Sequence, residues 1–120
     1  MIVFTRAVEM VRELVPDLET RIAQFEVEPF ELDEELIEAF REELEHLSDE
    51  MQAGLDSADD EQIRLAIHSI KGMSGTMGLP EISVLAQEIE LTLRAGERER
   101  FALLSNALIA WARDFVAAGK

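Results

Sequence analysis

Histidine is the side chain best suited to chemistry near neutral pH, and this chain of 120 residues contains two, His46 and His68. An imidazole can act as a nucleophile, a general base or a metal ligand. The chain contains no cysteine, which excludes disulfides, thiolate zinc sites and cysteine nucleophiles. Nucleophilic chemistry by a histidine or a cysteine therefore depends on these two residues.

The two histidines have different surroundings in the sequence. His46 stands outside the apolar stripe of its predicted helix, among Glu42, Glu43, Glu45 and Asp49. We interpret it as a solvated surface residue, because nothing in that pattern calls for catalysis.

His68 belongs to a predicted helix that runs from Ser57–Asp60 to about Met77. At about 100° per residue, its side chain points roughly 160° away from the centre of the apolar side of that helix. We therefore expect His68 on the outer face and not in the core. The apolar side consists of Ile63, Ala66, Ile67, Ile70, Met73, Ser74 and Met77.

The predicted outer face around His68 combines cations with glycines. Arg64 lies one turn before His68 and Lys71 flanks the same face, while Gly72 and Gly75 lie one and two turns after it. A glycine inside a helix costs about 0.5–1 kcal/mol relative to alanine. One explanation is that the helix ends at Gly72. The other is that the missing side chains let another protein's backbone approach the imidazole, and the apolar positions that continue beyond Gly72 favour it.

An exposed histidine between cations suits covalent chemistry. No serine and aspartate are obviously paired with His68, as a hydrolase would need. Arg64 and Lys71 would repel a metal cation, so we expect no metal site. A neutral ring nitrogen can instead attack a phosphoryl group, whose charge nearby cations stabilise.

The elements that position these residues are predicted to be helices. Alanine, leucine, glutamate and arginine dominate, tyrosine is absent, and no stretch alternates as a half-buried strand would. The first segment, from about Thr5 to Gln24, carries an apolar seam that Pro16 interrupts with a kink, or by starting a second short helix in its first turn. We expect this seam either to pack on its own domain or to form an arm that dimerises or links domains. The seam consists of Phe4, Val8, Val11, Val15, Leu18, Ile22 and Phe25.

A linker is predicted over residues 26–32, where Pro29 favours extended backbone. Asp33 then caps a second helix that reaches about Leu55. Gly78 ends the helix of His68, and Pro80 suits the first turn of the next. The inner stripe of the second helix is Leu36, Phe40, Leu44, Leu47, Met51 and Leu55.

The fourth helix is predicted from Pro80 to Ala95, stopped by Gly96, with Ile82, Leu85, Ala86, Ile89 and Leu93 inward. Val84 and Leu91 lie on its opposite side, for which the N-terminal helix is the natural partner. The last helix runs from about Arg98 to Ala117, before Gly119. Short loops make consecutive helices antiparallel. We therefore predict an all-α fold, an antiparallel up-and-down four-helix bundle over 30–118 with an additional N-terminal helical segment, 1–27, kinked near Pro16.

Charge and hydropathy limit the class of partner. The chain has 11 basic and 26 acidic residues, a net charge of −15, so we expect neither nucleic acid nor a membrane as a partner. No apolar run approaches the roughly 18 residues of a membrane span, and the start does not read as a signal peptide. We expect a cytoplasmic protein.

The residues from His68 to Gly78 closely resemble the signature of histidine-containing phosphotransfer (HPt) domains: a histidine, an apolar residue, Lys71 and Gly72, then Gly78 six residues later. The pairs Leu85-Ala86 and Ile89-Glu90 are similar to the family's downstream pattern. The upstream helix is similar too, and the resemblance covers about residues 30 to 117.

This resemblance implies a four-helix bundle that carries a phosphoryl group on His68. Lys71 would neutralise the phosphate, Gly72 would leave room beside it, and Gly78 would help to set the helix end. Two further residues come from the helical wheel alone. We expect Arg64 to stabilise the phosphate and Gly75 to give a partner access to His68. The family's partners are response-regulator receiver domains. The bundle itself binds no cofactor, since Mg²⁺ belongs to the receiver.

Two other functions compete with a relay between receivers in a two-component system. An HPt domain linked to a sensor or hybrid histidine kinase would be phosphorylated directly by that ATP-dependent kinase, although nothing in this sequence resembles a kinase domain. A non-catalytic helical adaptor would leave His68 without a role. For the partner surface, Leu65 is the candidate apolar residue, with packing on a neighbouring helix as its alternative.

Overall fold

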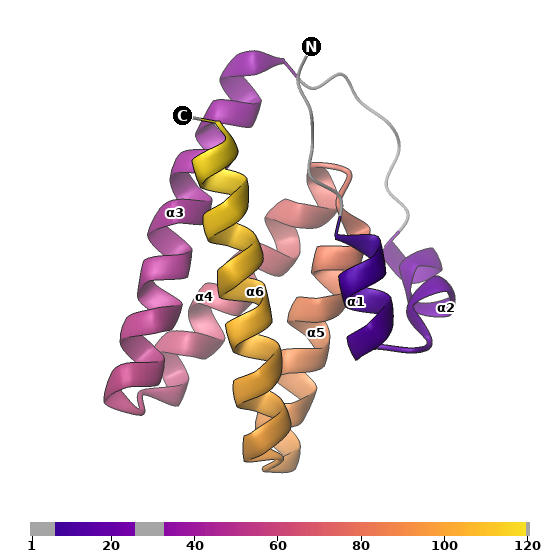
Figure 1. Ribbon diagram of the computed structural model, residues 1–120, viewed down its shortest axis with the longest axis vertical. Helices are drawn as coiled ribbons and strands as arrows, with labels where there is room; N and C mark the ends of the chain where they lie inside the picture. The colour runs from indigo at the N-terminus through magenta and orange to yellow at the C-terminus, as the bar shows by residue number, and fades with distance from the viewer. Residues whose placement is uncertain (1–6, 26–32, 120) are drawn as a thin grey trace.

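The computed structural model describes residues 7–25 and 33–119, and the described residues form helices and no strand (Figure 1). The all-α prediction is therefore confirmed. In chain order the elements are α1 (Val8–Leu14), α2 (Leu18–Ile22), the 3-10 turn η1 (Ala23–Phe25), α3 (Glu34–Ser57), α4 (Asp60–Thr76), α5 (Pro80–Ala95) and α6 (Arg98–Ala118).

The helix ends follow from side chains that the sequence places there. The Asp33 carboxylate accepts a hydrogen bond from the Leu36 N–H at 2.7 Å, and Asp59 accepts one from the Gln62 N–H at 3.1 Å. These caps satisfy donors that the first turn of a helix leaves free. Gly96, at φ +73°, ends α5 in the left-handed conformation that glycine adopts without a steric cost.

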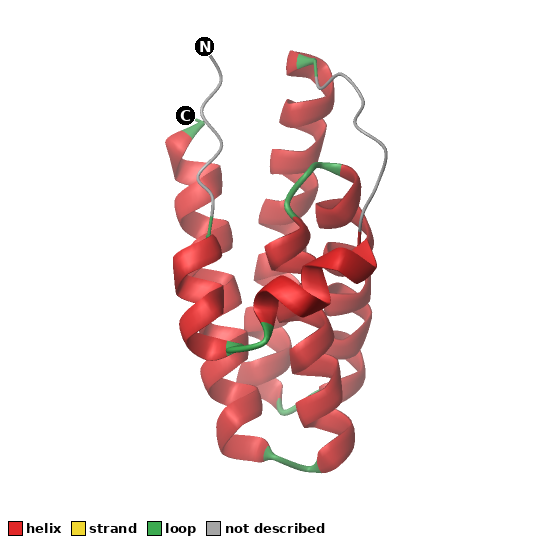
Figure 2. Ribbon diagram, turned by 90° about the vertical axis from the view of Figure 1, so that its right-hand side faces the viewer, coloured by secondary structure: helices red, strands yellow, loops and turns green. Residues whose placement is uncertain are grey.

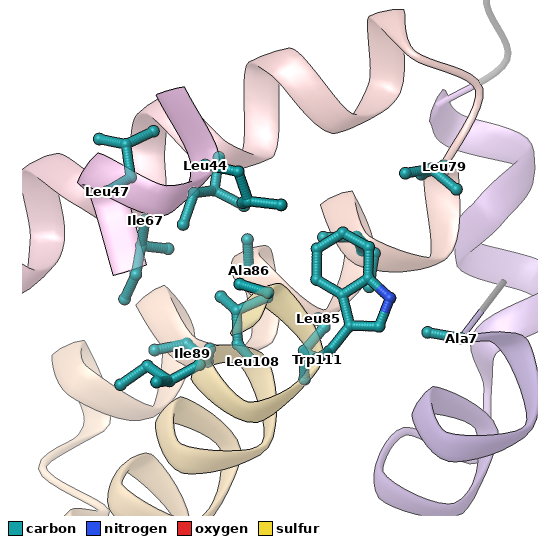
Figure 3. Packing of buried hydrophobic residues seen from close by; sticks show 14 of the residues in the cluster. Ala7, Leu44, Leu47, Ile67, Leu79, Leu85, Ala86, Ile89, Leu108 and Trp111 are labelled. Carbon is teal, nitrogen blue, oxygen red and sulfur yellow. The ribbon is translucent and has the colours of Figure 1, made fainter. Parts of the chain in front are cut away.

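Helices α3 to α6 form the bundle around one apolar core. Each of α4 and α5 packs against the helices before and after it, and α6 closes the bundle by packing against α3. Figure 3 shows how side chains from all four helices meet in the interior. They include Leu44 and Leu47 of α3, Ile67 of α4, Leu85, Ala86 and Ile89 of α5, and Leu108 and Trp111 of α6, all buried.

The inner stripe predicted for α3 needs two corrections. Leu36 is exposed, and its neighbour Ile37 is buried instead. Leu55, at the other end of α3, is only half-buried. Both residues lie in the terminal turns of a long helix, where fewer neighbouring helices cover the apolar face.

The N-terminal segment forms two short helices, as one of the two predictions for Pro16 requires. Pro16 itself lies in the turn between them, and Asp17 precedes α2, so its expected place in the first helical turn was wrong. Val11, Val15 and Leu18 are fully or almost fully buried in the same core as the bundle. Phe4, the Phe25 side chain and the linker expected over 26–32 lie outside the described residues.

Both short helices pack on the outer side of α5 (Figures 1 and 2). Polar contacts accompany this packing: the Ala7 N–H donates to Glu81 at 3.3 Å, and Arg21 pairs with Glu88 at 2.5 Å. Val84 is completely buried, which confirms the predicted second face of this helix. Leu91, predicted to share that face, is 46% exposed and remains uncovered. The seam thus packs on its own domain in this structure.

Helix α6 is long and apolar enough, by length and composition, to cross a membrane. Half of its most apolar window is buried inside the molecule, however. The buried residues include Phe101, Leu104, Leu108 and Phe115, which face the other helices. Packing in the bundle core accounts for the hydropathy of this helix.

The burial of the N-terminal helices predicts that they contribute to the stability of the bundle. Leu18→Ala should lower the free energy of unfolding by about 2–5 kcal/mol, because it removes a fully buried side chain. Leu103→Ala is the matched control, since Leu103 is 56% exposed and should change stability by less than about 0.5 kcal/mol. Urea unfolding followed by circular dichroism measures both. Equal, small effects would show that the N-terminal helices do not belong to the cooperative core.

Candidate functional site

His68 lies on α4 and is exposed, as the helical wheel predicts. The opposite side of α4 provides its core contacts, with Ile63, Ile67 and Ile70 almost completely buried. His46 is also exposed, and its ring nitrogen lies 3.1 Å from Glu50 on the same helix. The described residues contain no group of side chains that could hold a metal ion.

Helix α4 continues through both of its later glycines to Thr76. The alternative that the helix ends at Gly72 is therefore wrong. The Thr76 hydroxyl donates to the Gly72 carbonyl at 3.2 Å, a contact within the last turn. Beyond it, Met77 caps the helix and Gly78 adopts φ +77° in the short connection to α5. Gly78 thus occupies the helix-ending position that the sequence predicts.

The two glycines beside His68 have different surroundings. A Cβ atom at Gly72 would meet nothing within 4 Å, and Gly72 is exposed, so the surface at this position is open. A Cβ atom at Gly75 would lie only 3.3 Å from the Ser83 hydroxyl of α5. Gly75 therefore allows a close approach of α5 to α4. Its role in partner access stays a prediction.

Lys71 and Arg64, predicted as the cations of the site, are both paired with carboxylates. Lys71 Nζ lies 2.7 Å from Glu90 Oε1 of α5, and both side chains are largely buried. Arg64 donates to Glu61 through two nitrogens, at 2.5 and 2.9 Å. The hydrogen bond from Arg64 is the main cause that lowers the pKa of Glu61, and the same bond raises the pKa of Arg64.

The two cations expected around His68 are therefore each balanced by an acidic partner. Glu90, which the sequence shows only as part of the Ile89-Glu90 pair, is thus a residue of the site that was not predicted. The expected antiparallel packing of α4 and α5 could have been used to predict that Glu90 lies near Lys71. Glu90 immediately follows the core residue Ile89, which places it on the flank of α5 that faces α4.

An apolar groove lies on the other flank of the site, between α3 and α4. It has a volume of about 440 Å³ and reaches Gly72, one turn from His68. Its lining residues are mostly apolar: Leu36, Ala39, Phe40, Glu43, Gly72, Met73, Thr76 and Met77. His68 thus stands between a charged flank towards α5 and an apolar flank towards α3.

Leu65 lies one turn before His68 on its helix and is 54% exposed. The alternative that Leu65 packs on a neighbouring helix is therefore wrong. Single exposed apolar residues are ordinary on protein surfaces, so Leu65 matters here only because it shares α4 with His68. It adds apolar area to the outer face of that helix.

Comparison with known proteins adds one finding. A family model described as the Hpt domain matches residues 35–114, which is the span from the start of α3 to the last turns of α6. No curated protein and no solved structure matches the chain.

The different backbones of Gly72 and Gly78 predict opposite effects of the same substitution. Gly72→Ala should stabilise the protein by about 0.5–1 kcal/mol, because the site is helical and the added methyl group meets nothing. Gly78→Ala should destabilise it by about 1 kcal/mol or more, because the left-handed backbone disfavours a Cβ atom. Thermal unfolding of both variants measures the difference. A loss of stability in Gly72→Ala would contradict an open, helical position 72.

Proposed function

Because the chain belongs to the Hpt domain family and thereby has a histidine phosphotransfer role in phosphorelays, we propose that His68 is the residue that carries its phosphoryl group. One observation carries this proposal: His68 is exposed on α4 one turn before Gly72, which is also exposed and where an added Cβ atom would meet nothing within 4 Å. His46 has no such neighbour and already lies against Glu50.

The proposed step is a transfer between two side chains. A ring nitrogen of neutral His68 attacks the phosphorus of an aspartyl phosphate on a receiver domain. The new P–N bond forms as the P–O bond to the aspartate breaks, and the aspartate leaves as a free carboxylate. The proton on the other ring nitrogen can then pass to solvent. The reverse sequence delivers the phosphoryl group to the aspartate of a second receiver.

Lys71 and Arg64 are proposed to stabilise the charge of the transferred group. A phosphoryl group brings about −1.5 to −2 charges, so it would compete with Glu90 for the Lys71 ammonium group. The four charges of this flank, on Glu61, Arg64, Lys71 and Glu90, sum to zero before transfer. The cations therefore stabilise the phosphohistidine without holding it tightly, as suits a carrier that gives the group away.

We propose receiver domains as both donor and acceptor, in a cytoplasmic relay. The apolar groove between α3 and α4 and the exposed Leu65 provide apolar surface next to His68 for such a contact. Transient signalling contacts are small, often below about 1,200 Å² in total. The chain needs neither a nucleotide nor a metal of its own in this mechanism, because the receiver provides the activated phosphoryl group.

The central test compares two histidine variants. We expect the wild-type chain, mixed with a phosphorylated receiver, to gain one phosphate that is labile in acid and stable in alkali. His68→Gln should abolish this labelling, while His46→Gln should leave it unchanged.

Label that persists in His68→Gln would overturn the assignment of the site. Label that forms with a histidine kinase and ATP but never with a receiver would instead identify a kinase as the donor. Labelling of neither kind, with any receiver or kinase, would favour the adaptor function.

Access through Gly72 is tested by a larger side chain at that position. Gly72→Gln should slow transfer by about tenfold or more, because misplacing the reacting groups by about 1 Å has a large effect on the rate. The fold should be retained, since nothing lies within 4 Å of the added Cβ atom. Rapid-quench measurements give the transfer rate, and circular dichroism shows whether the variant is folded. Unchanged transfer in a folded variant would contradict the access argument.

A further inference from the structure

Lys71 is connected to α5 at both of its ends. Its main-chain carbonyl accepts a hydrogen bond from the Ser83 hydroxyl at 2.7 Å, and its ammonium group lies 2.7 Å from Glu90. Ser83 and Glu90 are two helical turns apart, so they lie on the same face of α5. One face of α5 therefore contacts both the main chain and the side chain of Lys71.

The Ser83 contact is unusual among the hydroxyl groups of the described residues. The hydroxyls of Ser48, Ser57 and Thr92 donate to carbonyls in the preceding turn of their own helices. The Ser83 hydroxyl, which is completely buried, crosses to a different helix instead. Its acceptor there is the main-chain carbonyl of Lys71, three residues after His68.

Gly75 makes this crossing possible. A Cβ atom at position 75 would lie 3.3 Å from the Ser83 oxygen, closer than most side-chain contacts. The glycine therefore leaves the space that the hydroxyl needs to reach the Lys71 carbonyl. Gly75, Ser83 and Lys71 form one contact between α4 and α5, which we call the Ser83 contact.

We propose that Ser83 is a positioning residue for phosphoryl transfer, acting through Lys71. This inference rests on the proposed function of His68. A free lysine side chain has large rotational entropy, and stabilising charge is most effective when it is in place before the reaction. The Ser83 contact fixes the main chain from which the Lys71 side chain extends. It therefore defines where the ammonium group lies relative to the phosphoryl group.

The first experiment removes the hydroxyl group in the whole chain of 120 residues. Ser83→Ala should lower the rate of transfer from a receiver charged with acetyl phosphate by about fivefold, the equivalent of one ordinary hydrogen bond. Ser74→Ala is the matched control: Ser74 is also fully buried, lies on α4, and its hydroxyl has no hydrogen-bond partner among the described residues. It should transfer at the wild-type rate. Ser83→Thr retains a hydroxyl group and should restore most of the rate.

A spectroscopic measurement separates positioning from a general loss of stability. The carbonyl ¹³C resonance of Lys71 should shift in Ser83→Ala, because the carbonyl loses a hydrogen-bond donor, and it should stay in place in Ser74→Ala. Thermal unfolding of each variant shows whether it is folded at the assay temperature. This measurement needs no phosphotransfer, so it tests the contact independently of the rate.

A double-mutant cycle tests the contact from the α4 side. Gly75→Ala should displace the Ser83 hydroxyl and slow transfer to an extent similar to that in Ser83→Ala. In the double variant the effects should not add, because the Ser83→Ala substitution has already removed the hydroxyl that Gly75→Ala would displace. Additive effects would show that the two residues act independently.

The outcomes distinguish this inference from the function on which it rests. A wild-type chain that never gains phosphate on His68 would overturn the proposed function itself. A wild-type chain that transfers normally, with Ser83→Ala as fast as Ser74→Ala, would overturn the positioning role of Ser83 alone. An unchanged Lys71 carbonyl resonance in Ser83→Ala would also overturn it.

Discussion

The antiparallel contact between α4 and α5 is the constraint on which the candidate site depends. Together with the packing of α3 on α4, it buries the apolar side of α4, with Ile63, Ile67 and Ile70, and by the geometry of a helix His68 then faces the solvent. The same contact places Glu90 beside Lys71. Burial of the core and exposure of the imidazole are thus two results of one packing arrangement.

Two other parts of the molecule support this arrangement from opposite sides. The short helices α1 and α2 cover the outer side of α5, where Val84 is completely buried and Arg21 pairs with Glu88. On the far side of the site, α3 forms an apolar groove with α4, and Gly72 is one of its lining residues. A partner that approaches His68 would therefore meet charged groups on one flank and an apolar hollow on the other. Such an asymmetric surface favours one orientation of the partner.

Much of this arrangement could be predicted from the sequence, because it depends on local signals. The apolar period of α4 predicts the exposure of His68, Asp33 predicts the start of α3, and Gly78 predicts the end of α4. Each of these signals acts within one or two turns of a helix. The spacing of residues along the chain was sufficient to interpret them.

Other features of the site could not be predicted from the sequence, because they depend on distances between helices. Gly75 lies close to His68 on a wheel, yet the neighbouring α5 determines what its missing side chain makes room for. The pairing of Lys71 with Glu90 and the exposure of Leu91 depend on how far each neighbouring helix reaches. Such information comes from tertiary packing, which a single helix does not encode.

The most direct test of the central claim is a ³¹P NMR spectrum of the chain after mixing with a phosphorylated receiver, with the modified residue then located by mass spectrometry. We expect one phosphoramidate resonance and a phosphoryl group on His68. An acyl phosphate or phosphoester resonance on this chain, or a phosphoramidate located on His46 or on a lysine, would contradict it.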